Sequence, residues 1–187
     1  MKYLIAGLGN IGSEYVNTRH NIGFKILDAL ANASNIVFED RRYAFRAVYK
    51  FKGRTFVLIK PTTFMNRSGR AVNYWLAKEK LSPEKLLVIV DDVALPFGKL
   101  RLKPGGGDAG HNGLRDISIM LGNQNYPRLR FGIGDNYPKG AQAHYVLSPW
   151  NEEEKKILPE RIEIAIEMIK SFGVIGVENT MNEFNNR

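Results

Sequence analysis

The sequence contains no cysteine among its 187 residues. This absence excludes disulfide bonds, thiolate metal sites and a cysteine nucleophile, and it fits a reducing compartment such as the cytoplasm. A chain of this length buries roughly 70% of its unfolded surface on folding, so it needs no covalent cross-link to hold a core. We therefore expect one compact cytoplasmic domain over residues 1–187.

Long hydrophobic runs and an excess of acidic residues are also missing. The apolar run in "MKYLIAGLGNIG" is too short for a signal peptide or a membrane span, and we expect it to form a buried first strand. Asp and Glu total 19 against 27 Lys and Arg, which gives a net charge of +8. This balance favours a polyanionic partner such as nucleic acid, although an ordinary basic protein would show it too.

Apolar runs predict six strands. The run "LLVIV" is unbroken, as is typical of a strand that is covered on both faces. The predicted strands are Tyr3–Gly7, Tyr43–Phe51, Thr55–Lys60, Leu86–Asp91, Lys99–Lys103 and Arg128–Gly134.

Helical periodicity appears in four segments. They lie at Ile22–Leu30, Val72–Leu76, Leu114–Leu121 and Ile162–Ile169. Ser82 and Pro83 signal a short helix start or turn, and Pro159 should kink or start the last long helix. Because helices and strands alternate and no repeat or linker divides the chain, we predict a single-domain, three-layer α/β/α fold with a mixed, mainly parallel central sheet.

A glycine motif follows the first predicted strand. Gly7, Gly9 and Gly12 spell G-x-G-x-x-G, which cradles a pyrophosphate in dinucleotide-binding folds, and "NIVFED" ends on acidic residues that could bind a ribose. In those folds the helix begins within the motif, whereas here helical periodicity starts only near Ile22. The spacing therefore argues against a nicotinamide oxidoreductase, which we keep as a lesser alternative.

Ligands of such sheets bind at the carboxyl ends of strands, so we expect a site among the loops after Gly7, Lys60 and Val90. The second loop begins "PTTFMNRSG", where Asn66 on its own would fit a helix cap. A further loop, "KPGGGDAGHNG", lacks the lysine-hydroxyl ending of a nucleoside triphosphate site. It ends in His111, for which a site role and a loop role are equally compatible with the sequence.

Taken together, the motifs resemble those of the bacterial peptidyl-tRNA hydrolase family. "GLGN-x-G-x-x-Y-x-x-TRHNxG", "PTTFMNRSG", "VDDVALPFGKLRLK", "GGGDAGHNGL" and "RLRFGIG" occur in the family's order and cover nearly the whole chain. The resemblance implies a monomer that needs no cofactor and hydrolyses the ester between peptide and tRNA. Ile11 stands where the family commonly has proline, which removes no chemical group.

The resemblance also implies roles for individual residues. It makes His20 the general base, Asp91 the carboxylate that orients it, and Asn10 a residue that discriminates blocked from unblocked aminoacyl ends. The residues it implies in substrate binding are Asn66 and Asn112 as amides, Tyr15 and Phe64 at the tRNA acceptor end, and Lys103 and Arg130 at the terminal 5′-phosphate.

The proposed chemistry suits these residue types. A neutral imidazole with a pKa near 6.5 can take a proton from water, and a carboxylate on one ring nitrogen fixes its tautomer. Asp92 should face differently from Asp91, because successive strand residues alternate sides. No G-x-S-x-G elbow indicates a covalent serine mechanism, so we expect direct attack by water. No metal-binding spacing is present, so we expect no metal site.

Basic pairs should line the predicted cleft. Arg101 and Lys103 should share one strand face, as should Arg128 and Arg130, and the alternative is simply a solvated strand surface. A noncatalytic RNA-binding relative is the main alternative function, since the wider family includes splicing factors. Such an RNA-binding protein would also carry a positive net charge, but it would not need His20, Asp91 and Asn10 as catalytic residues.

Overall fold

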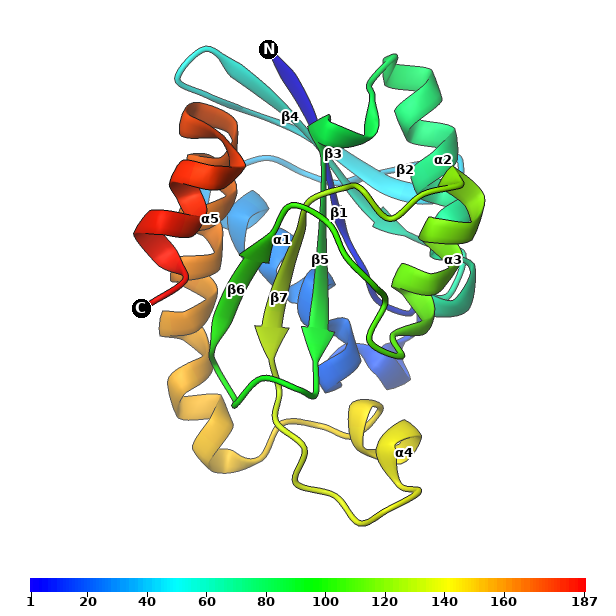
Figure 1. Cartoon of the computed structure of the whole chain (residues 1–187), viewed down its shortest axis with the longest axis vertical. Coiled ribbons are helices and arrows are strands. Elements are labelled where there is room, and N and C mark those ends of the chain that lie inside the picture. The colour runs from blue at the N-terminus through cyan, green and yellow to red at the C-terminus, as the bar shows by residue number, and fades with distance from the viewer.

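The computed structural model describes residues 1–187 and contains a single seven-stranded sheet in the order β2-β3-β4-β1-β5-β7-β6 (Figure 1). The strands are β1 (Lys2–Gly7), β2 (Glu39–Arg41), β3 (Ala44–Phe51), β4 (Arg54–Pro61), β5 (Leu86–Asp92), β6 (Leu100–Lys103) and β7 (Arg128–Gly132). The four central strands β4, β1, β5 and β7 run parallel, and β2, β3 and β6 add antiparallel edges. The predicted mixed, mainly parallel sheet is confirmed.

Helices cover both faces of the sheet. On one side lie α1 (Ile22–Ala33) and the long α5 (Glu152–Phe184), and on the other lie α2 (Ser68–Glu79) and α3 (Asn112–Leu121) (Figure 1). The short α4 (Gln142–Val146) lies beyond the carboxyl ends of the central strands. None of the helices is both long enough and apolar enough to cross a bilayer.

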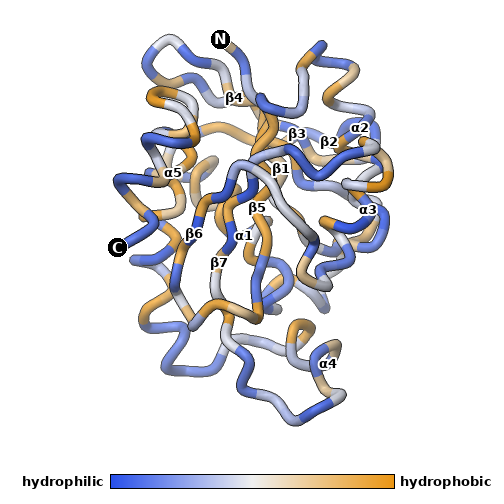
Figure 2. The backbone as a smooth tube through the Cα atoms, in the orientation of Figure 1, coloured by the Kyte–Doolittle hydropathy of each residue, from blue (hydrophilic) through white to orange (hydrophobic).

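The alternation of side chains along β1 divides the core into two layers. Tyr3 and Ile5 pack with α1 and α5, while Leu4 and Ala6 pack with α2 and α3. Every residue of β5 is buried, as its unbroken apolar run predicts. Figure 2 shows the apolar residues concentrated on the central strands and the polar residues on the outer faces of the helices.

The predicted elements differ from the structure in several places. The sequence reasoning did not predict α4, a five-residue helix with no buried residue. The sequence reasoning missed β2, a three-residue edge strand whose residues are all exposed, so no apolar pattern marks it. Pro159 does not start the last helix, which begins at Glu152 behind a capping box formed by Asn151 and Glu154. The backbone of α5 leaves helical geometry at Gly176, whose φ is 88°, rather than at Pro159.

The glycine motif is used for close packing of β1 on α1. A Cβ on Gly7 would lie 2.4 Å from the carbonyl oxygen of Gly23, and a Cβ on Gly9 would meet the ring of Phe24 at 2.7 Å. Gly12 is followed only by a three-residue 3₁₀ turn, Ser13–Tyr15, and the first α-helix begins at Ile22, well past the motif, so no α-helix N-terminus faces these glycines. The arrangement therefore lacks the helix-end geometry of a pyrophosphate cradle.

Gly23→Ala tests this contact. The added methyl group would lie 2.4 Å from the backbone nitrogen of Leu8, so we expect the free energy of unfolding to fall by about 3 kcal/mol. Urea denaturation measures the loss. Gly107→Ala is the matched control, because a Cβ there meets nothing within 4 Å and the change should cost less than about 0.5 kcal/mol. Equal stability of the two variants would contradict the packing argument.

Candidate active site

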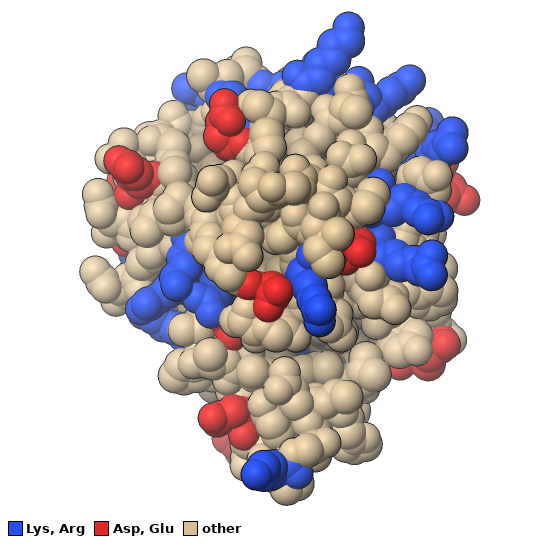
Figure 3. Space-filling model, turned by 45° about the vertical axis from the view of Figure 1, so that its right-hand side comes forward, with Lys and Arg blue, Asp and Glu red and all other residues tan.

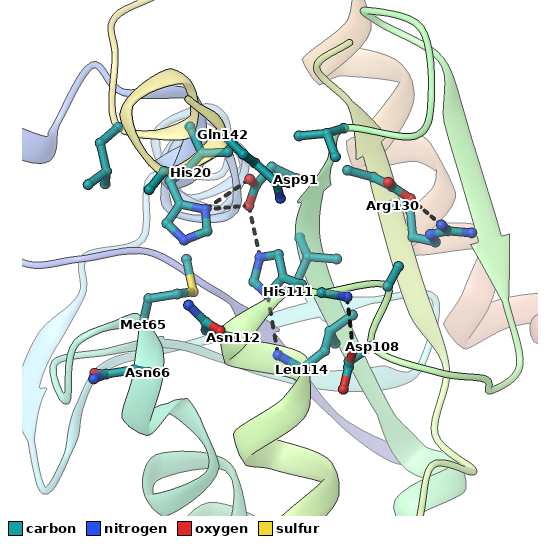
Figure 4. Close-up of a pocket in the computed structure, with 18 of the residues that line it drawn as sticks. His20, Met65, Asn66, Asp91, Asp108, His111, Asn112, Leu114, Arg130 and Gln142 are labelled. Atoms are coloured by element: carbon teal, nitrogen blue, oxygen red, sulfur yellow. Dashed lines mark hydrogen bonds and ion pairs between the residues drawn. The ribbon is translucent and has the colours of Figure 1, made fainter. Parts of the chain in front are cut away.

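A pocket of about 490 Å³ opens at the carboxyl edge of the central strands. The loops after β1, β4 and β5 all reach it, as the sequence predicts, through Asn10, Asn66 and Val93 respectively, and Asp91 reaches it from the end of β5. The start of α3 and one side of α4 complete the wall (Figure 4). The pocket thus gathers residues that are distant in the sequence around one buried carboxylate.

His20 and Asp91 form a direct pair at the base of this pocket. Nδ1 of His20 lies 2.9 and 2.8 Å from the two carboxylate oxygens of Asp91, which is only 4% exposed. His20 belongs to a 3₁₀ turn, Arg19–Asn21, that leads directly into α1. Because Nδ1 donates to Asp91, the lone pair of Nε2 is left on the pocket side of the ring.

His111 is a second imidazole on the same carboxylate. Its Nε2 lies 2.9 Å from Oδ1 of Asp91, while its Nδ1 accepts from the backbone N–H groups of Gly113 and Leu114 at the start of α3. A nitrogen that accepts cannot carry a proton, so this pattern assigns neutral His111 with its proton on Nε2. The sequence offered only one signal for this role, the placement of His111 immediately before a helix.

The two histidines set the protonation of the group. Burial alone would raise the pKa of Asp91, but the two imidazoles beside it hold that pKa well below its ordinary value. Burial likewise works to lower the pKa of His20, yet the charge and hydrogen bond of Asp91 outweigh it and raise the pKa overall. Asp91 therefore remains ionised at neutral pH and faces an imidazole that it orients.

The turn that carries His20 is fastened on both sides. On one side the guanidinium of Arg19 donates to Ser148 and to Glu154, the latter at 2.7 Å, and stacks on the ring of Tyr145 at 4.2 Å. On the other side the carboxamide of Asn21 accepts from the backbone N–H of Asn10 at 2.9 Å and donates to its carbonyl at 2.8 Å. Sequence reasoning identified neither Arg19 nor Asn21 as a positioning residue.

The residues predicted to bind the substrate do not all lie in the pocket. Asn66 and Asn112 line it with exposed side chains, and Asn10 lines it with its Oδ1 already accepting from the backbone N–H of Met65. Tyr15 is half-buried and Phe64 is 49% exposed, and neither belongs to the pocket wall.

The predicted basic pairs have different environments. Arg130 lines the pocket and forms an ion pair with Asp92, whereas Lys103 is exposed and has no ion-pair partner. Arg128 is not available for a ligand phosphate, because it is only 1% exposed and donates to the carbonyl groups of Gly107 and Gln124 at 2.9 Å. Through these hydrogen bonds Arg128 holds the glycine-rich loop that contains Gly107, and the loop covers the Arg128 side chain. Strand alternation predicts which face Arg128 occupies, but it does not predict that a loop buries that face.

The same cluster includes potential metal ligands. Atoms of His20, Asp91 and His111 lie within 4.8 Å of one another, a set that could contact a cation. The nitrogen-to-oxygen distances of 2.8–2.9 Å are those of direct hydrogen bonds. A tetrahedral ion with ligands at about 2.0–2.1 Å would need these atoms farther apart, so the arrangement suits proton transfer better than coordination.

Ser68 lies two residues after Asn66, and its hydroxyl has a structural role. It is fully buried, and its Oγ donates to the carbonyl of Met65 at 2.7 Å. It does not line the pocket. The site therefore offers an oriented imidazole facing open space rather than an activated serine.

An NMR titration of the His20 ring tests the electrostatic account. We expect a pKa above the ordinary 6.5 in the wild type and below it in Asp91→Asn, because burial then acts without an opposing charge. At pH 6.5 the ring should thus be mostly protonated in the wild type and mostly neutral in the variant. Chemical shifts of exposed His144 serve as the control for global change. An unchanged His20 curve would contradict the role of Asp91.

Comparison with known proteins agrees with this geometry. A protein-family model described as "Peptidyl-tRNA hydrolase" matches residues 4–187. The chain is 57% identical to the peptidyl-tRNA hydrolase of Bacteroides fragilis and 52% identical to that of Cytophaga hutchinsonii, each over the full length of both chains. The crystal structure of peptidyl-tRNA hydrolase from Acinetobacter baumannii superimposes with a TM-score of 0.92 at 36% identity, covering 98% of this chain and 94% of that one. The chain therefore belongs to the peptidyl-tRNA hydrolase family.

Proposed function

We propose that this protein hydrolyses the ester that joins a peptide to tRNA, with His20 activating the attacking water. The observation that carries the proposal is the buried Asp91 carboxylate, which receives Nδ1–H of His20 and leaves Nε2 on the pocket side. An imidazole held in this tautomer is a competent general base. Membership of the family supplies the substrate class.

The reaction needs two proton transfers. Nε2 of His20 takes a proton from water as the new carbon–oxygen bond forms, and Asp91 stabilises the resulting imidazolium. When the tetrahedral intermediate collapses, the ester oxygen of the terminal ribose leaves and takes that proton back. The products are a peptide with a free carboxyl group and a tRNA with a free hydroxyl, and His20 returns to its neutral form.

The amides around the pocket suit substrate binding. Asn66 and Asn112 can hold the ester carbonyl and donate as negative charge develops on its oxygen, a contribution worth about 10²–10³ in rate per donor in other acyl-transfer sites. We assign Asn10 the discrimination of blocked from unblocked ends, because its backbone is fixed by Asn21 and its side chain faces the pocket.

Basic and aromatic residues in and outside the pocket wall suit the RNA. We assign Lys103 and Arg130 to the 5′-phosphate, with Arg130 exchanging the carboxylate of Asp92 for the phosphate. Tyr15 and Phe64 lie outside the pocket wall, where the half-buried ring of Tyr15 and the exposed ring of Phe64 can stack on the bases of the acceptor end. Because one chain supplies every residue of the site, we propose that the monomer is active.

Release of peptide from an N-blocked aminoacyl-tRNA tests the catalytic proposal. We expect wild-type activity to persist in EDTA, and His20→Ala to lose at least about 100-fold in kcat, because a positioned general base contributes about 10²–10⁴. His144→Ala, a change at an exposed histidine, is the matched control. Binding of tRNA by the wild type without any hydrolysis would instead favour a noncatalytic RNA-binding protein, and loss of activity in EDTA would favour a metal site.

Salt dependence tests the phosphate assignment. We expect the affinity for tRNA to fall steeply with salt, and Lys103→Gln to reduce the slope of log affinity against log salt concentration by about 1. Lys103 suits this test because its removal leaves no buried partner unpaired. Lys156→Gln, an equal loss of charge at an exposed position of α5, should leave the slope unchanged. A slope that Lys103→Gln does not alter would remove Lys103 from the RNA contact.

A further inference from the structure

Arginines and tyrosines gather beside the pocket on the side of α2 and the β2–β3 turn. This arginine–tyrosine patch consists of Arg42, Tyr43, Arg67, Arg70 and Tyr74. The three arginines are exposed, and none forms an ion pair. Figure 3 shows basic side chains outnumbering acidic ones along the right-hand side of the molecule. Unpaired guanidinium groups in such a setting are free to bind an anion.

The patch is packed rather than scattered. The rings of Tyr43 and Tyr74 meet edge to face with centroids 5.6 Å apart, and the guanidinium of Arg42 lies 5.1 and 5.4 Å from them. Arg70 lies 5.9 Å from the ring of Tyr43. Arg67, at the start of α2, lies three residues before Arg70 and seven before Tyr74, a spacing that places all three on one side.

Tyr43 occupies an unfavourable backbone position in this patch. It is the second residue of the two-residue turn between β2 and β3, and its φ is 65°, a region where glycine or asparagine is usual. Its carbonyl accepts from the N–H of Thr62, and Trp75 donates to the carbonyl of Arg42, both at 2.8 Å. In this turn the ring of Tyr43 packs against the ring of Tyr74 and beneath the guanidinium of Arg42, so the turn presents the ring to the patch.

The patch lies at the same edge of the sheet as the pocket. Ala44 pairs with Pro61 at the carboxyl end of β4, and α2 begins two residues after Asn66 of the pocket wall. From β5, which carries Asp91, the sheet order leads through β1 and β4 to β3. Three strand spacings of about 4.8 Å place the turn roughly 14 Å from Asp91, the reach of about four extended residues.

We propose that the patch binds the peptide part of the substrate and favours an acidic side chain about four residues from the ester. This inference rests on the proposed function. Lys103 and Arg130, assigned to the RNA, lie on β6 and β7 on one side of β5, whereas the patch lies beyond β1 and β4 on the other. Phe64, assigned to the acceptor end, lies in the loop between β4 and α2, so the terminal nucleotide reaches that loop. With the ester at His20, the peptide is the part of the substrate that continues past this loop toward the patch.

Peptidyl-tRNAs that differ in one residue test this inference. The substrates carry an N-acetylated pentapeptide on one tRNA, with Asp, Asn or Lys at the fourth residue from the ester, and N-acetyl-aminoacyl-tRNA serves as the reference. We expect wild-type kcat/KM to be about 2- to 5-fold higher for Asp than for Lys, the range for exposed charge contacts. In the double variant Arg42→Gln/Arg70→Gln this ratio should fall to about 1.

Two further variants separate the patch from general charge and folding effects. Lys50→Gln/Lys156→Gln removes the same charge at exposed positions elsewhere and should keep the wild-type ratio. Tyr43→Asn keeps a residue that tolerates positive φ while it removes the ring that packs beneath Arg42, so the protein should fold and the ratio should fall.

The results that would overturn the peptide subsite differ from the result that would also overturn the proposed function. Equal wild-type rates for Asp and Lys, with active hydrolysis of the reference, would overturn the peptide subsite alone. A double variant that slows every substrate equally and lowers the salt slope would assign the patch to RNA and overturn it too. A wild-type protein that leaves the reference intact would overturn both this inference and the proposed function.

Discussion

The arrangement of the site depends on one buried carboxylate that has two imidazole donors. Asp91 ends a strand that is buried throughout, and an ion in such a place is stable only when hydrogen bonds replace the lost water. His20 and His111 supply those bonds from two different elements. The carboxylate in turn selects the tautomer of each ring. Since each partner fixes the others, His20, Asp91 and the start of α3 form one unit.

His111 links the Asp91 carboxylate to the start of α3 in this unit. By accepting two backbone N–H groups with Nδ1, it acts as the N-cap of α3, and these hydrogen bonds require an Nδ1 without a proton. A second positive charge beside His20 would compete for Asp91, so a neutral neighbour suits the site. Asn112, the first residue of α3, is thereby placed at the pocket by the same cap.

The sequence predicted the strands and the loops of the site because both depend on local pattern. An apolar run marks β5, and the polar residues at its end mark the site at the sheet edge. The fastening of the catalytic turn could not be predicted, because Arg19 and Glu154 are 135 positions apart. Arg128 was equally hidden, since strand alternation predicts a face but not the loop that covers it. Local sequence pattern thus predicts the helices and strands, whereas the structural roles of Arg19 and Arg128 depend on contacts between segments that are distant in the sequence.

The bond between Arg19 and Glu154 also has a consequence for how the protein matures during its own synthesis. The turn that carries the base is made early, but its partners Ser148 and Glu154 leave the ribosome much later. The central strand β1 must likewise wait for β4 and β5 before it has neighbours on both sides. In a nascent chain the turn that carries His20 therefore lacks its contacts with Ser148 and Glu154 until most of the chain has emerged. His20, the proposed base, is thus translated early, while the contacts that fix its turn can form only after Ser148 and Glu154 have emerged.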